Sequence, residues 1–179
     1  MRVISGSARG KKLLCVENMD IRPTLDRVKE SVFNMIAFDV ADAIVLDLFS
    51  GSGALGIEAL SRGAAHCTFT DKASASVSVT KKNIEATRFG DISSVICTDS
   101  IDFIEKTVEK YDIIFIDPPY ESDLYEKSLS AIKKHGILSE GGFIVLEYDT
   151  EISPDFSTDG YSIVKDKKYG RVRILIMKE

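Results

Sequence analysis

The sequence lacks any apolar run of the ~18 residues that a membrane-spanning helix requires. The basic residues near its start are not followed by the apolar segment of a secretory signal. Its three cysteines form no C-x-x-C pair, and its two histidines stand far apart, outside any cluster with metal-ligand spacing. We therefore expect a cytoplasmic protein with no metal and no membrane partner, and with Cys67 and Cys97 reduced in its core.

Low-complexity linkers and internal repeats are also missing, so nothing in the 179 residues marks a boundary between domains. A chain of this length with 44% hydrophobic residues can bury a sizeable core. We expect a single domain over residues 1–179 that acts as a monomer. Residues 1–38 would form an N-terminal extension, and residues 39–179 would form the core.

What the sequence does contain is an alternation of short apolar runs and helical patterns. The runs are mostly β-branched or aromatic, as buried parallel strands are: Ile44–Leu48, Cys67–Thr70, Ser94–Cys97, Ile113–Ile116 and Phe143–Leu146. Helical spacing predicts the segments between and after them: Ala54–Ser61, Ser74–Thr87, a helix from Ser100 through Val108, and Leu124–Lys134. Because parallel neighbours need crossover helices, this order predicts a doubly wound, Rossmann-like α/β sheet.

The two ends of the chain differ from this alternation. Arg2–Ser5 and Lys11–Val16 predict an N-terminal β-hairpin, and a helix begins at Pro23. Tyr161–Val164 and Val172–Met177 predict a C-terminal hairpin that closes the sheet with an antiparallel strand. The expected sheet has seven strands and is mostly parallel, and its antiparallel ending favours a methyltransferase over a dehydrogenase.

A glycine-rich turn, DLFSGSGALG, starts at Asp47 directly after the first strand. Gly51, Gly53 and Gly56 satisfy G-x-G-x-x-G, a pattern in which small residues let a ligand approach the backbone closely. Asp71 follows Gly51 by 20 residues, at a strand end where a carboxylate can bind a ribose diol. Both features suit either NAD or an adenosyl cofactor.

Asp47 favours the adenosyl cofactor. A pyrophosphate prefers bare backbone N–H groups without a neighbouring anion, whereas the ammonium group of S-adenosylmethionine can bind an acid at the strand tip. Capping of nearby loop amides is the alternative role for Asp47. Phe49 would be a packing residue that shapes the same cofactor loop.

Asp99 and Ser100 follow the third strand, in the crevice where open α/β sheets bind ligands. Asp99 could accept a hydrogen bond from the adenine amino group of the cofactor. Helix capping explains both residues equally well, and the two roles are compatible.

The tetrapeptide Asp117-Pro118-Pro119-Tyr120 follows the fourth strand. The two prolines end the strand and hold the Asp117 carboxylate and the Pro118 carbonyl in fixed, extended geometry. Two such acceptors can hold the hydrogens of an exocyclic base amine and direct its lone pair at a sulfonium methyl. Tyr120 offers an aromatic face on which an extruded base can stack. A turn without chemistry is the alternative for these four residues.

The net charge of −5 conceals an uneven distribution. Residues 1–30 hold seven cations against four anions, a net charge of +3, which leaves −8 for the remainder. A second basic cluster lies near the C-terminus, within residues 165–173. Basic clusters of this size are either solvated surface or contacts for nucleic-acid phosphates.

Three stretches together resemble the bacterial 16S ribosomal RNA guanine-N2 methyltransferase family, the small-subunit rRNA methyltransferase D type. They are RPTLDRVKESVFN from Arg22, LDLFSGSGALGIEALSR from Leu46, and DPPY from Asp117. The D-P-P-Y element is shared with adenine-N6 and other amino methyltransferases, whereas the first string is more restrictive. An amphipathic helix with a solvated basic face remains the plain interpretation of that string.

The resemblance implies transfer of methyl from S-adenosylmethionine to guanine N2 in 16S rRNA, within an assembling small subunit. Cofactor binding would fall to Asp47, Phe49, Gly51, Gly53, Asp71, Asp99 and Ser100, and catalysis to Asp117, Pro118, Pro119 and Tyr120. The N-terminal hairpin and helix would help hold RNA, with Arg2, Arg9, Lys11, Lys12, Arg22 and Arg27 as the candidate contacts. The rival functions are adenine-N6 methylation of DNA or RNA, a non-catalytic RNA-binding assembly factor, and an NAD-dependent oxidoreductase.

Overall fold

The computed structural model describes residues 1–16, 23–118, 123–152, 158 and 160–179. Its helices are α1 (Pro23–Met35), α2 (Ala54–Ser61), α3 (Ser74–Thr87), α4 (Ser100–Lys106) and α5 (Leu124–His135). Its strands are β1 (Ile44–Asp47), β2 (His66–Asp71), β3 (Ser93–Cys97), β4 (Tyr111–Ile116), β5 (Leu138–Asp149), β6 (Ser162–Tyr169) and β7 (Val172–Lys178). Short 3-10 turns span Gly90–Ile92 and Thr150–Ile152.

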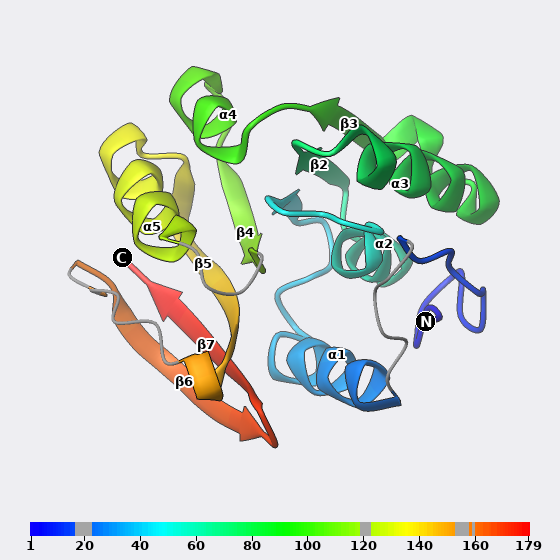
Figure 1. The fold of residues 1–179 in the computed structure, drawn as a ribbon, viewed down its shortest axis with the longest axis horizontal. Coiled ribbons are helices and arrows are strands. Elements are labelled where there is room, and N and C mark those ends of the chain that lie inside the picture. The colour runs from blue at the N-terminus through cyan, green and yellow to red at the C-terminus, as the bar shows by residue number, and fades with distance from the viewer. Residues whose placement is uncertain (17–22, 119–122, 153–157, 159) are drawn as a thin grey trace.

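Within the described residues, the strands form one seven-stranded sheet in the order β3-β2-β1-β4-β5-β7-β6 (Figure 1). The first five strands pair in parallel, and β7 pairs antiparallel with both β5 and β6. This confirms the expected mostly parallel α/β sheet with an antiparallel C-terminal end. The reversal of strand order between β1 and β4 opens the crevice where such sheets bind ligands.

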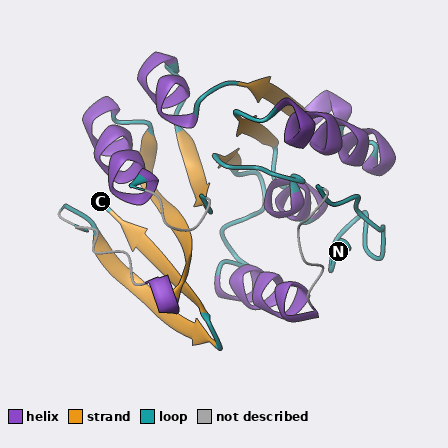
Figure 2. Cartoon of the chain, in the orientation of Figure 1, coloured by secondary structure: helices purple, strands orange, loops and turns teal. Residues whose placement is uncertain are grey.

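Two hydrophobic clusters cover the two faces of the sheet. Side chains from α1, α2 and α3 pack on one face, which we call the α1 face, and those from α4 and α5 pack on the other. Figure 2 shows the same layering, with helices on both sides of the strands. Successive residues of β4 alternate between the clusters, since Phe115 belongs to the α1 face and Ile116 to the opposite one.

The N-terminal hairpin is present but short: Arg2 and Lys12 form an antiparallel bridge, and the Val3 N–H donates to the Lys11 carbonyl at 2.9 Å. Three other local expectations were wrong. Cys97 is exposed rather than in the core, because β3 is the edge strand of the sheet. Val108 lies beyond the end of α4 and is fully exposed. β5 begins at Leu138, well before the predicted start at Phe143, and its pairing with β4 changes register in between.

Candidate active site

The glycine loop turns the chain from β1 into α2. Gly51 and Gly53 both have positive φ, +54° and +76°, a conformation that side-chain-bearing residues rarely adopt. A Cβ added at Gly56 would lie 2.3 Å from the Phe69 ring, so this third glycine is needed for packing of α2 on β2. Phe49 is half-buried and packs with the α4–α5 cluster, in agreement with its expected packing role.

Neighbouring elements hold the loop in place through hydrogen bonds. The Gly51 N–H donates to Asp71 Oδ2 at 2.9 Å, so the loop contacts the strand-end carboxylate that lies 20 residues further along the sequence. Thr80 of α3 donates to the Gly51 carbonyl at 3.0 Å, and Asn83 donates to the Ser52 carbonyl at 2.8 Å. These bonds fix the loop backbone before any ligand arrives.

Asp47 lies beneath the loop and is almost fully buried. Its Oδ2 accepts a hydrogen bond from the Gly56 N–H at 3.0 Å, so the loop-capping role is present. Burial raises the pKa of Asp47 to about 7, and the charges of Asp117 and Asp71 raise it further against the opposing effect of that hydrogen bond. In the described part of the chain no cation forms an ion pair with Asp47, so a cationic ligand would relieve its charge.

Asp99 and Ser100 lie at the carboxyl end of β3. Asp99 Oδ1 accepts from the Ile101 N–H at 2.9 Å and from the Asp102 N–H at 3.3 Å, which is an N-cap for α4. The buried Ser100 hydroxyl donates to the Leu48 carbonyl at 2.6 Å, behind the glycine loop. The capping role expected of both residues is therefore found for Asp99 alone, since the Ser100 hydroxyl bonds Leu48 instead. Contact of Asp99 with adenine stays a prediction.

Asp117 follows β4 directly, with Pro118 buried behind it. Burial raises the pKa of the Asp117 carboxyl well above its ordinary value, and the charge of Glu147 raises it further. Pro119 and Tyr120 lie outside the described residues, and their catalytic role stays a prediction.

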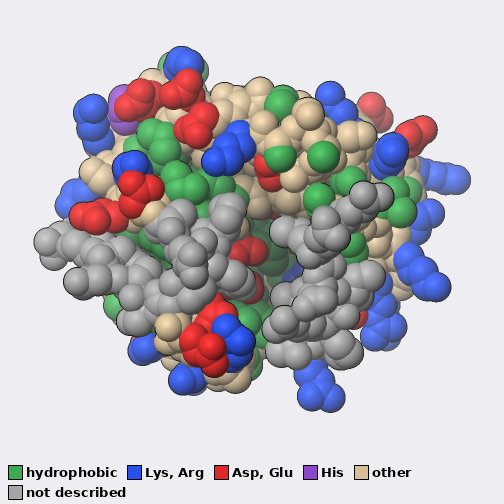
Figure 3. Space-filling view, viewed as in Figure 1, with side chains coloured by type: hydrophobic (Ala, Val, Ile, Leu, Met, Phe, Trp, Pro, Cys, Tyr) green, Lys and Arg blue, Asp and Glu red, His purple; other side chains and the backbone are tan. Residues whose placement is uncertain are grey.

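The carboxyl ends of β1, β4 and β5 bring three acids together. Asp47 pairs in register with Phe115, and Ile116 pairs with Leu146, so Glu147 lies one residue beyond that pair, level with Asp117. Strand alternation puts all three carboxylates on the α1 face. Acidic side chains are visible in the hollow near the middle of the molecule in Figure 3. Sequence reasoning had missed Glu147, which belongs to no recognisable motif.

The candidate RNA-binding residues lie mostly on the surface. Arg2, Arg9, Lys11, Lys12 and Arg27 are exposed, and Arg22 lies outside the described residues. Lys and Arg side chains gather on the side of the molecule where α3 and the N-terminal segment lie (Figures 1 and 3). Arg2 forms a 3.5 Å ion pair with Asp26 of α1, so part of its charge is compensated within the protein. RNA contact by these residues stays a prediction.

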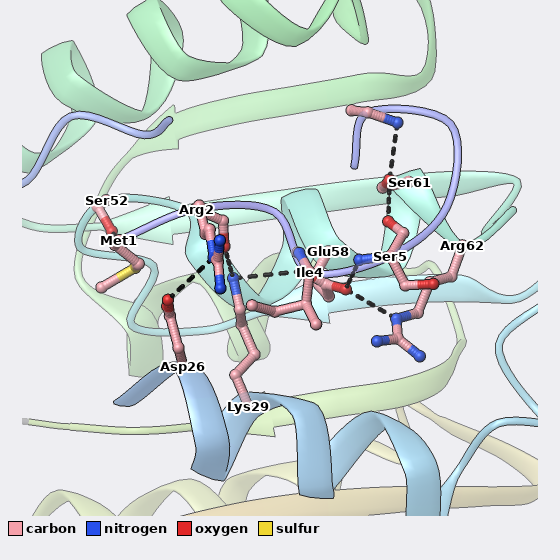
Figure 4. Close-up of polar contacts among 12 residues, drawn as sticks. Met1, Arg2, Ile4, Ser5, Asp26, Lys29, Ser52, Glu58, Ser61 and Arg62 are labelled. Carbon is pink, nitrogen blue, oxygen red and sulfur yellow. Dashed lines mark hydrogen bonds and ion pairs between the residues drawn. The ribbon is translucent and has the colours of Figure 1, made fainter. Parts of the chain in front are cut away.

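A buried polar network, also missed from the sequence, attaches the N-terminal segment to α1 and α2 (Figure 4). Glu58 of α2 is fully buried and accepts from the N–H groups of Ile4 and Ser5, at 2.8 and 3.0 Å. It also pairs with Arg62 at 2.8 Å and with Lys29 of α1 at 3.3 Å. We call these residues the Glu58 network.

The turn of the N-terminal segment docks closely on the end of α2. The Ser7 N–H donates to the Ser61 carbonyl at 2.7 Å, and the Ser61 hydroxyl donates to the Ser5 carbonyl at 2.6 Å. A Cβ at Gly6 would lie only 1.7 Å from that Ser61 carbonyl oxygen. The candidate RNA-binding segment is therefore rigidly attached to the helix that follows the glycine loop.

The described residues contain neither a membrane-spanning helix nor a metal-binding cluster. None of their helices combines the length and apolar character needed to cross a bilayer. Nor do they contain a group of three or more His, Cys, Asp or Glu side chains arranged to hold a metal ion.

A family model and a methyltransferase of known name both match nearly the whole chain. A family model described as Conserved hypothetical protein 95 matches residues 1–178. Ribosomal RNA small subunit methyltransferase D of Escherichia coli strain K12 is 34% identical over 172 residues, which are 96% of this chain and 86% of that protein.

Solved structures with the same fold include two that are described as methyltransferases. The yhhF protein of Escherichia coli superimposes with a TM-score of 0.88 at 32% identity, over 99% of this chain and 96% of that one. SMU.776, described as complexed with SAH, shares the fold with a TM-score of 0.72 at 20% identity, over 89% of this chain and 50% of its own. The chain thus belongs to the Conserved hypothetical protein 95 family, to which the resemblance in sequence to small-subunit rRNA methyltransferases D had pointed.

Proposed function

We propose that this protein transfers methyl from S-adenosylmethionine to the N2 amine of a guanine in 16S rRNA, as a monomer acting on an assembling small subunit. One observation carries the proposal: the fixed glycine loop and the Asp117-Pro118 strand end lie on neighbouring strands, at the same edge of the sheet. A cofactor bound at the first would meet a base amine held at the second. The family relative that is named for small-subunit rRNA methylation supports this substrate.

The residues at the glycine loop fit S-adenosylmethionine. Asp47 is a buried carboxylate suited to an ammonium group, and the Asp71 carboxylate beside the glycine loop can accept hydrogen bonds from a ribose diol. The buried Ser50 hydroxyl of this loop has no hydrogen-bond partner among the described residues, so a polar ligand would satisfy it. The complex of SMU.776 with SAH, in the same fold, supports this assignment. When bound, the cofactor supplies a methyl group on a sulfonium, which is an electrophile.

Asp117 and the Pro118 carbonyl act on the other reactant. A guanine N2 amine is a poor nucleophile, because its lone pair is delocalised into the ring. Two acceptors that take its hydrogens favour a pyramidal nitrogen whose lone pair points away from them. The methylated amine is strongly acidic and loses its proton to Asp117 or to water.

The test uses small subunits from cells that lack the gene. They are incubated with the purified protein and labelled S-adenosylmethionine, and the rRNA is digested to nucleosides for mass spectrometry. We expect labelled N2-methylguanosine, and none with Asp117→Ala. Labelled N6-methyladenosine would support the adenine alternative, and binding without transfer would support the assembly factor. Calorimetry that shows tight NAD binding, with no adenosyl binding, would overturn the cofactor assignment.

A further inference from the structure

Glu147 lies level with Asp117 on the neighbouring strand, beside the proposed amine site. β4 and β5 are parallel with Ile116 opposite Leu146, so Asp117 and Glu147 are the next residues on neighbouring strands. Strands in a sheet are ~4.8 Å apart, which puts the two side chains within reach of one small group. Phe115 and Val145 both lie on the α1 face, and residues two positions further on share that face.

The side chain of Glu147 is buried, and the described residues supply no compensating charge. The residue is only 8% exposed, and no described residue forms a hydrogen bond or ion pair with its carboxylate. Burial raises its pKa to about 7, and its charge is one cause of the raised pKa of Asp117, in keeping with their level positions on neighbouring strands. A buried acid left without donors is costly in a purely structural position, and such acids mark places where a ligand supplies the donors.

The edge of guanine supplies the matching donors. Its N1–H lies directly beside the N2 amine, whereas the nitrogen beside the N6 amine of adenine is a bare acceptor. A carboxylate next to the amine site accepts from guanine N1–H and repels the lone pair of adenine N1. We propose that Glu147 accepts the N1–H of the target base and so selects guanine over adenine. This inference rests on the proposed function, because it assumes an N2 amine at Asp117.

The size of the effect follows from the same argument. A site built around a buried polar group rejects an analogue that lacks the matching partner, since the group is then left unpaired. We expect wild-type kcat/KM to fall at least ~100-fold when the target keeps its N2 amine but loses N1–H.

The experiment replaces the target guanine, once mapped, by 2-aminopurine in 16S rRNA assembled by ligation and reconstituted into subunits. 2-Aminopurine keeps the N2 amine, but its N1 is an acceptor. 6-Thioguanine, which is altered at position 6 but retains N1–H, is the control base. Glu147→Gln offers an amide donor to N1 of 2-aminopurine. It should therefore lower the ratio of kcat/KM for guanine to that for 2-aminopurine at least ~10-fold. Glu140→Gln, an exposed change on the same strand, should leave the preference unchanged.

The outcomes separate the inference from the proposed function. Equal wild-type rates on guanine and 2-aminopurine would overturn the role of Glu147 while N2 methylation stands. A wild-type preference that Glu147→Gln leaves unchanged would assign the selection to another group. If Glu147→Gln does not fold, the wild-type comparison with 6-thioguanine still decides whether N1–H is read. Absence of any N2 methylation by the wild type would instead overturn the proposed function.

Discussion

Two buried glutamates in this molecule have opposite surroundings. Glu58 accepts two backbone hydrogen bonds and pairs with Arg62 and Lys29, so its charge is compensated from three segments of the chain. Glu147 is almost as deeply buried, but no described residue compensates it, and the strand register puts another acid, Asp117, level with it on β4. The first arrangement stabilises a fold, whereas the second keeps an acceptor available for a ligand.

Removing the compensated acid should have the largest effect on the free energy of unfolding. Glu58→Ala leaves Lys29 buried, and burial already lowers the pKa of that lysine against the opposing effect of Glu58. We expect a loss of about 3–5 kcal/mol, measured by urea unfolding with circular dichroism because the chain has no tryptophan. The exposed Glu85→Ala is the control. A loss no larger than that of the control would refute the role of the Glu58 network.

Removing the charge of Asp47 should raise the free energy of unfolding of the ligand-free protein, whereas removing Glu58 lowers it. Its native pKa is about 7 against 3.8 for the ordinary side chain, so wild-type stability should fall as pH rises through this interval. Asp47→Asn keeps an acceptor for the Gly56 N–H and removes the charge. We therefore expect it to raise stability at pH 8, by at most about 4 kcal/mol, with little difference at pH 4.

The same substitution should weaken cofactor binding, since the ammonium loses its ionised partner. Wild-type affinity for S-adenosylhomocysteine should rise from pH 6 to pH 8, and Asp47→Asn should be weaker at pH 8 by about 10–100-fold, as measured by calorimetry. Equal affinities of the wild type and Asp47→Asn from pH 6 to pH 8 would refute the contact between Asp47 and the cofactor ammonium.

The exposed basic residues of the N-terminal segment should have the smallest effect on stability. The triple change of Arg9, Lys11 and Lys12 to Gln should alter unfolding by less than about 0.5 kcal/mol. It should weaken binding to small subunits and reduce the salt dependence of that binding, because fewer phosphates are contacted. The control is the triple change of Lys106, Lys110 and Lys134 to Gln, three exposed lysines outside both basic clusters. If the dependence of binding affinity on salt concentration is unchanged, these residues do not contact RNA and the N-terminal segment has a structural role only.

The sequence predicted those features of the site that depend on local pattern. β-Branched runs located the parallel strands, and the glycine spacing located the turn from β1 into α2, whereas the Gly51–Asp71 hydrogen bond was not expected. Glu58 and Glu147 were missed because each is a single acid whose significance depends on distant partners or on their absence. Ile4 and Glu58, for example, are 54 residues apart in sequence. The exposure of Cys97 also depends on tertiary structure, since only the strand order makes β3 an edge.

Asp117→Ala in single-turnover transfer of labelled methyl to unmodified small subunits tests the central claim most directly. The variant should remain folded and able to bind S-adenosylhomocysteine, with a melting temperature at or above that of the wild type, because the surroundings that raise the pKa of Asp117 disfavour its charge. The rate of transfer to guanine N2 should fall by about 10²–10³-fold or more, because the amine loses its principal acceptor. A wild-type rate from this variant would contradict the account.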